Sequence, residues 1–144
     1  MEVSVVRQRV QELLRQSKRP AADHRADRRA QTDAATREYA LFLERIAVPL
    51  FKQVAGILRA ENHPFDVFTP GSSVRLMSGR GNDDYIEVAL DTKGAAPKLI
   101  GRASHARGGD VTQTELVLNA TADISALTDE DLLGYVLSEL EYFL

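Results

Sequence analysis

The most regular apolar pattern in the chain lies between residues 36 and 61. Apolar side chains recur there every three or four residues, which is the spacing of one face of an α-helix. This first stripe consists of Tyr39, Phe42, Leu43, Ile46, Leu50, Val54, Ile57 and Leu58. Pro49 has no backbone N–H, so we expect it to kink the helix or divide it near Val48. The pattern predicts a helix about 39 Å long, more than a small domain requires.

A second apolar stripe, formed by Leu41, Val48, Phe51 and Ala55, lies about 150° from the first when residues are placed at 100° steps. A helix that is apolar on two sides must be covered on two sides. We expect a sheet to cover one side, and the N-terminal helix or a second subunit to cover the other. These four residues are therefore the predicted interaction surface of a homodimer.

The first 35 residues are predicted to form a separate N-terminal segment. Residues 4–18 have the pattern of a short amphipathic helix, which Pro20 ends. Its apolar stripe comprises Val3, Val6, Val10, Leu13, Leu14 and, at its end, Ser17. Residues 20–35 are rich in Ala and Arg and hold no large apolar side chain, so either a mobile linker or a solvated helical extension fits them. The predicted division is a helix with linker over 1–35 and a single domain over 36–144.

Between residues 65 and 120 the period of the pattern changes to two, as in the strands of a half-buried antiparallel sheet. Turn-forming residues divide this region into strands over 65–69, 73–78, 84–92, 98–107 and 112–120. Gly101 is expected to mark a bulge in the fourth strand. The inward side chains predicted for the last strand are Thr114, Leu116, Leu118 and Ala120. The charges predicted to pair across strands on the opposite face are Arg75, Glu87, Arg102 and Glu115.

A final helix begins at Thr128, which is a good N-cap with Asp131 at the capping-box position. The whole order predicts a two-layer α+β fold: a long N-terminal helical segment, a five-stranded antiparallel β-meander, and a C-terminal helix packed on one sheet face. In element order the chain is similar to several small dimeric bacterial α+β proteins, including nucleoid-associated and secretion-chaperone types. Such a likeness of architecture does not set function.

Composition removes several classes of function. The 144 residues include no Cys, which excludes disulfide scaffolds, thiolate zinc sites, iron–sulfur clusters and Cys nucleophiles. No apolar run approaches the roughly 18–20 residues that span a bilayer, and Met1-Glu2-Val3-Ser4 does not open a signal peptide. We therefore expect a soluble cytoplasmic protein with no membrane partner.

Charge is distributed unevenly between the two halves of the chain. Residues 1–60 hold 12 of the 18 Lys and Arg but only seven of the 21 Asp and Glu, whereas residues 61–144 carry a net charge of −8. The basic arm, residues 15–29, is the extreme case, and its candidate anion contacts are Arg15, Lys18, Arg19, Arg25, Arg28 and Arg29. Such an arm suits nucleic acid, an acidic partner, or the acidic half of the same or a neighbouring chain.

Candidate catalytic groups are sparse. His24, His63 and His105 lie in three separate elements without a metal-ligand spacing, so surface or capping roles are expected. Asp91 and Lys93 have the D-x-K spacing of metal-dependent nucleases, in which the carboxylate holds Mg²⁺ and the lysine steadies the attacking water. That chemistry also needs a second carboxylate nearby, and no metal site or cofactor is predicted.

Three hypotheses follow. The first is a non-enzymatic protein-interaction protein, an adaptor or chaperone-like molecule for an unknown partner, homodimeric through the long helix. The second is nonspecific association with nucleic acid through the basic arm, weak and strongly salt-dependent. The third is a metal-dependent hydrolase built around Asp91 and Lys93.

Overall fold

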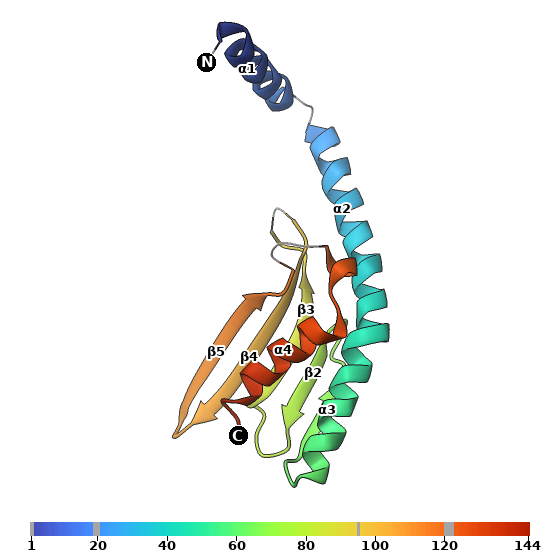
Figure 1. Cartoon of the computed structure of the whole chain (residues 1–144), viewed down its shortest axis with the longest axis vertical. Helices are drawn as coiled ribbons and strands as arrows, with labels where there is room; N and C mark the ends of the chain where they lie inside the picture. Colours follow the sequence, from blue (N-terminus) through green and yellow to red (C-terminus); the bar gives the residue numbers. More distant parts are fainter. Residues whose placement is uncertain (1, 19–20, 95, 120–122) are drawn as a thin grey trace.

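The computed structural model describes residues 2–18, 21–94, 96–119 and 123–144. Its elements, in chain order, are α1 (Val3–Ser17), α2 (Ala21–Phe42), the π-helical segment η1 (Leu43–Ala47), α3 (Val48–Ala60), β1 (Phe65–Phe68), β2 (Val74–Ser78), β3 (Tyr85–Asp91), β4 (Lys98–Arg107), β5 (Asp110–Val117), the 3-10 turn η2 (Ile124–Ala126) and α4 (Asp129–Leu140). The strands form one antiparallel sheet in the order β1-β2-β3-β4-β5, with α3 and α4 on the same face (Figure 1). The predicted α+β class, the five-stranded meander and the C-terminal helix after it are therefore confirmed.

α2, η1 and α3 form one continuous helical rod from Ala21 to Ala60. The Ala/Arg-rich segment is thus helical from Ala21 onward, which selects the solvated extension over the linker. Pro20 and Arg19 lie outside the described residues. A kink at Pro49 or a division near Val48 is predicted; the structure instead has the π-helical turn η1 immediately before α3, in which Pro49 is the second residue.

The π-helical turn changes which side chains share a face. A π-bulge is equivalent to one residue inserted into an α-helix, so it shifts the angular position of all later residues by about 100°. Tyr39 and Phe42 before the turn therefore share one buried face with Phe51, Val54 and Leu58 after it. The two stripes predicted from a regular helix are largely one face, interrupted by the bulge.

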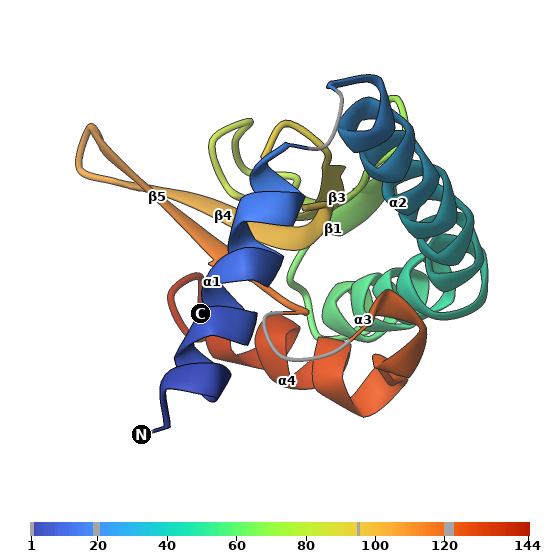
Figure 2. The ribbon, with the colours of Figure 1, turned by 90° about the horizontal axis from the view of Figure 1, so that it is seen from above.

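The core fills the space between this face of the rod, α4 and the sheet. α3 contacts β1 and β2, while α4 lies across the later strands (Figure 2). The apolar sheet residues with no exposed surface are Val74, Leu76, Ile86, Val88 and Leu99. They follow the predicted period of two, and the paired registers Val74↔Val88 and Leu76↔Ile86 place them on one face.

Gly101 allows α4 to approach the sheet closely. A Cβ at this position would lie 2.4 Å from Cζ of Tyr135, far inside van der Waals contact. The register runs without interruption through Val88↔Gly101 and Gly101↔Leu116, so the predicted bulge is wrong. The glycine instead makes room for an aromatic ring from the facing helix.

The opposite face carries the predicted charge ladder. Arg75 bonds Glu87 at 2.6 Å, Arg102 lies 3.6 Å from Glu87, and Arg102 also lies 3.3 Å from Glu115. Glu87 is only 5% exposed, so its carboxylate is stabilised by the guanidinium groups on either side. The pairing of these four residues across β2 to β5 is confirmed.

α4 begins with the predicted capping box. Thr128 Oγ1 accepts a hydrogen bond from the backbone N–H of Asp131 at 3.2 Å, and the Asp131 carboxylate accepts one from the N–H of Thr128 at 3.0 Å. After the helix, Phe143 packs against the core and meets Phe65 edge to face, with the ring centroids 6.1 Å apart. The capping box therefore closes the N-terminal end of α4, and Phe143 holds the residues after the helix against the body.

Candidate protein-interaction site

Most of the dimer surface predicted on the long helix is buried in the core of the same chain. Phe51 and Ala55 have no exposed area, and Val48 is half-buried against the same core. Only Leu41, 47% exposed, remains accessible, beside a hollow of about 210 Å³ that Ile124 also lines. The correction follows from η1, which turns Phe51 and Ala55 toward the chain's own sheet, so a second subunit is not needed to cover them.

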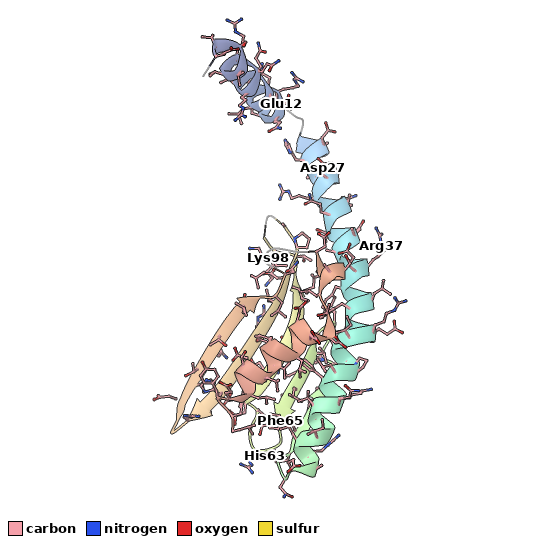
Figure 3. The ribbon with its side chains drawn as sticks, viewed as in Figure 1. Glu12, Asp27, Arg37, His63, Phe65 and Lys98 are labelled. Atoms are coloured by element: carbon pink, nitrogen blue, oxygen red, sulfur yellow. The ribbon has the colours of Figure 1, made fainter. Side chains whose placement is uncertain are left out.

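The basic arm spans the end of α1 and the first turns of α2. Arg15, Lys18, Arg28 and Arg29 are exposed, and Arg15 forms an i,i+3 ion pair with Glu12 at 3.3 Å. Arg25 is also exposed and has an electrostatic or hydrogen-bonding partner. Arg19 lies outside the described residues. These side chains project from a helical arm beyond the sheet (Figure 3, where Glu12 and Asp27 mark the two helices).

α1 exposes its whole apolar stripe. The helix contains no buried residue, and its larger apolar side chains are 37–72% exposed, from Val5 to Val3. Figure 1 shows α1 beyond the end of α2, away from the sheet. The sequence predicted the amphipathic pattern correctly, but within the described structure nothing covers it.

The proposed hydrolase residues do not assemble into a metal site. Oδ1 of Asp91 accepts a hydrogen bond from the backbone N–H of Lys93 at 2.9 Å, which is the geometry of a turn after a strand. No group of three or more His, Asp or Glu side chains able to hold a metal ion occurs in the described ranges. Nor do the histidines converge, since His105 stacks on Tyr142 at 5.4 Å while His24 lies in α2.

The surface that sequence reasoning missed is the outer strand β5. Every residue from Asp110 to Leu116 is exposed, including Val111 at 47% and Leu116 at 55%. Leu116 does point to the helical side, as predicted, but the helices end before they reach it. Figure 2 shows the β4–β5 hairpin extending beyond the helical layer. Ala120, the last predicted inward residue, lies outside the described residues.

A groove lies between β5 and α4 on the helical side of the sheet. It has a volume of about 460 Å³, within the range of ligand-binding clefts. The residues that line it are Leu116, Val117, Leu118, Asn119, Ala126, Leu127, Asp131, Gly134, Tyr135 and Ser138. We call this the β5–α4 groove; its lining is mixed, with leucines from the strand and small or polar residues from the helix.

The Tyr135 hydroxyl is a buried polar group within this lining. Tyr135 is 7% exposed, and its hydroxyl has no hydrogen-bond partner among the described residues. Burial, and to a smaller extent the nearby Glu139 carboxylate, raises the pKa of the phenol well above its usual value, so the neutral form is retained at physiological pH. The hydroxyl lies against the sheet at Gly101, 2.7 Å from the position that a Cβ would take there.

The C-terminal region that forms the groove is acidic, although two arginines of β4 lie beside it: Arg102 is 3.3 Å from Glu115, and Arg107 donates to the carbonyl of Tyr142. Residues 108–144 contain no Lys or Arg; their acidic residues are Asp110, Glu115, Asp123, Asp129, Glu130, Asp131, Glu139 and Glu141. Asp131 belongs to the lining itself. The groove therefore favours a ligand that is apolar on one side and positively charged on the other.

The chain was compared with known protein families, curated proteins and solved structures. No family model, no curated protein and no solved structure matches the chain. Among the described residues, no helix combines the length and the apolar character that crossing a bilayer demands.

Proposed function

We propose that the protein acts by binding other proteins rather than by catalysis, as an adaptor or chaperone-like molecule. Its binding site is the β5–α4 groove, and its ligand is an apolar, basic segment of a partner. The observation that carries the proposal is Leu116: a core-facing leucine, 55% exposed, on a strand that no helix covers. A second protein segment that packed there would extend the helical layer over the last strand.

The physical gain on binding comes mainly from Leu116 and its neighbours. Removing about half of a leucine side chain from water is worth roughly 1–1.5 kcal/mol. Basic residues on the ligand add long-range attraction to the acidic groove, which salt screens over about 10 Å at 0.1 M. This combination predicts weak binding whose affinity falls further as salt is added.

The most direct probe is a labelled peptide with the sequence of α1, residues 2–18. α1 is an amphipathic helix with the chemistry the groove favours: Val10 and Leu13 lie on its apolar stripe, and Arg15 lies on its polar side. We expect the peptide to bind the full chain in fluorescence anisotropy. A scrambled peptide of the same composition, which has no apolar stripe, should bind at least tenfold more weakly.

Two matched variants locate the site. Leu116→Asn removes the apolar contact at β5, whereas Ile57→Asn makes the same change at a 65% exposed position on α3. The proposal predicts about a tenfold loss of affinity for Leu116→Asn and none for Ile57→Asn. Equal binding by the two variants, or by the two peptides, would refute it.

A second candidate function is nonspecific nucleic-acid association, which the exposure of the basic arm favours. Phosphate contacts by Lys and Arg release counterions, so such binding falls steeply with salt. Replacing Arg28 and Arg29 by Ala should then lower the affinity for a duplex and reduce the salt slope, with Arg59→Ala on α3 as the control. Absence of duplex binding at low salt would eliminate this candidate.

A further inference from the structure

We infer that β5 pairs with β5 of a second copy of the chain, in antiparallel orientation, and joins the two sheets into one. The inference goes beyond the proposed groove and does not depend on it, since pairing uses the edge of the strand and the groove lies on its face. It also moves the expected dimer contact from the long helix to the opposite side of the molecule.

The hydrogen-bonding pattern shows which backbone groups of β5 are available. The N–H of Leu118 donates to the carbonyl of Leu99 at 2.8 Å, which places even-numbered residues of this strand toward β4. Because antiparallel ladders alternate, the odd-numbered residues direct their N–H and C=O groups away from the sheet. These residues are Val111, Gln113, Glu115 and Val117. They present a row of donors and acceptors along a strand of eight residues, and no other strand of the described residues lies beside it.

Apart from the charges of Asp110 and Glu115, β5 lacks the features that protect edge strands from pairing. Natural sheets use Lys, Pro, a bulge or a very short strand at an edge for this purpose. β1, the other edge, is four residues long, contacts α3, and carries an ion pair between Asp66 and Arg59 at 3.0 Å. β5 has no Lys, Arg or Pro, and its register with β4 is uninterrupted from Asp110 to Val117.

The sequence of β5 is complementary to itself in one register. Residues opposite each other in an antiparallel pair must point to the same face, and a two-fold axis at Thr114 satisfies this condition. Val111 then faces the partner's Val117, Thr114 faces its own copy, and Gln113 faces the partner's Glu115. Each is a favourable cross-strand pair, and no two carboxylates meet. Moving the axis to Gln113 would place Val111 opposite Glu115 and lose the valine pair.

The two-fold axis also places both copies of α4 on the same side of the joined sheet. The two β5–α4 grooves then lie next to each other, with the paired β5 strands as their common floor. Each groove stays open to a ligand, because pairing at the strand edge covers none of Leu116's face. The two uncovered strands are together about as wide as one packed helix.

A proline substitution at the edge tests the inference. Gln113→Pro removes an N–H that points away from the sheet, so the β4–β5 ladder is retained while pairing with another strand is blocked. Gln113→Ala changes the same side chain and keeps the N–H. We expect light scattering at micromolar concentration to give about twice 15.9 kDa for the wild type and for Gln113→Ala, and the monomer mass for Gln113→Pro.

Two further measurements keep the test decisive. Circular dichroism and α1-peptide binding should be unchanged in Gln113→Pro, which separates loss of the dimer from loss of the fold or of the groove. If the proline variant does not fold, Val111→Asp, which places a carboxylate opposite Val117, should weaken the dimer at least tenfold. A wild type that remains at the monomer mass would overturn the inference and leave the β5 edge to an extended segment of a different protein. Dimers that persist in both folded variants would also overturn it.

Discussion

Gly101 and Tyr135 illustrate how one missing side chain fixes the spacing between two layers. The ring of Tyr135 occupies the space that a Cβ would fill, so α4 lies closer to β4 than any other residue type would permit. The sequence shows a glycine within a strand pattern, which is equally typical of a bulge and of a close approach. Only the position of α4, set by distant residues, distinguishes the two.

We expect Gly101→Ala to lower the free energy of unfolding by about 1–3 kcal/mol, because the new methyl group overlaps the Tyr135 ring. Gly134→Ala is the matched control: its Cβ would meet nothing within 4 Å, and removing a helical glycine should stabilise the fold by about 0.5–1 kcal/mol. Urea denaturation measures both. A Gly101→Ala protein as stable as the wild type would contradict the packing described.

Tyr39 gives the fold a dependence on high pH. Its hydroxyl donates to the carbonyl of Ser72, and burial, followed by the Glu87 carboxylate, raises its pKa from 10.0 to about 12. Because the folded pKa exceeds the unfolded one, the stability that neutral Tyr39 contributes is complete below about pH 10 and is lost as the pH rises toward about 12.

At neutral pH, Tyr39→Phe should be less stable than the wild type by about 1 kcal/mol, because it lacks the hydrogen bond. Between pH 9 and pH 11.5, however, its free energy of unfolding should fall by less than that of the wild type. The exposed Tyr142 provides the control, and Tyr142→Phe is expected to follow the wild type. Equal losses of stability in Tyr39→Phe and the wild type, measured by urea unfolding across this range, would show that Tyr39 is not responsible.

At the scale of elements, the decisive feature is the π-helical turn between α2 and α3. Placing every residue at 100° steps produces two apolar stripes, because this spacing treats the residues of η1 as α-helical. Pro49 signalled an irregularity, but a kink and an inserted residue have different consequences for the later faces. The surface assigned to Val48, Phe51 and Ala55 was wrong for this reason.

Deletions provide a sharp test of this account. Removing Arg45, an exposed residue of η1, should convert the π turn to an α turn and leave Tyr39, Phe51 and Leu58 on one face, so the protein should still fold. Removing Gln53, an exposed residue of α3, should rotate Leu58 off the core and cost at least about 3 kcal/mol more. Thermal unfolding compares the stability of the two deletion variants. Equal stability would contradict the interpretation that η1 acts as one residue inserted into an α-helix.

The strands were predictable because their period of two is a local property, whereas the exposure of β5 depends on the width of the helical layer. A packed helix occupies 8–10 Å and a strand about 4.8 Å, so two helices cover about four strands. In a five-stranded sheet, two helices therefore leave one strand uncovered. Two inward positions of β5 hold threonines, Thr112 and Thr114, and these polar residues are the sign in the sequence that the strand is exposed.

At the scale of the whole molecule, the charge asymmetry of the sequence becomes spatial separation. The basic arm lies on α1 and α2 beyond the sheet, and the acidic C-terminal region surrounds the β5–α4 groove on the body (Figure 1). The sequence predicted the asymmetry and the amphipathic α1. It did not predict that β5 is exposed while Phe51 and Ala55 of the long helix are buried, because that depends on how the layers meet.

The central claim is that the molecule meets other proteins at β5 and not at the long helix. The most direct measurement is amide hydrogen exchange, resolved by NMR and performed at low and high protein concentration. If two copies pair at β5, the outward N–H groups of Gln113, Glu115 and Val117 become strongly protected as protein concentration rises, while exchange around Leu41 stays the same. Rapid exchange of these three amides at every concentration, or new protection confined to the long helix, would contradict it.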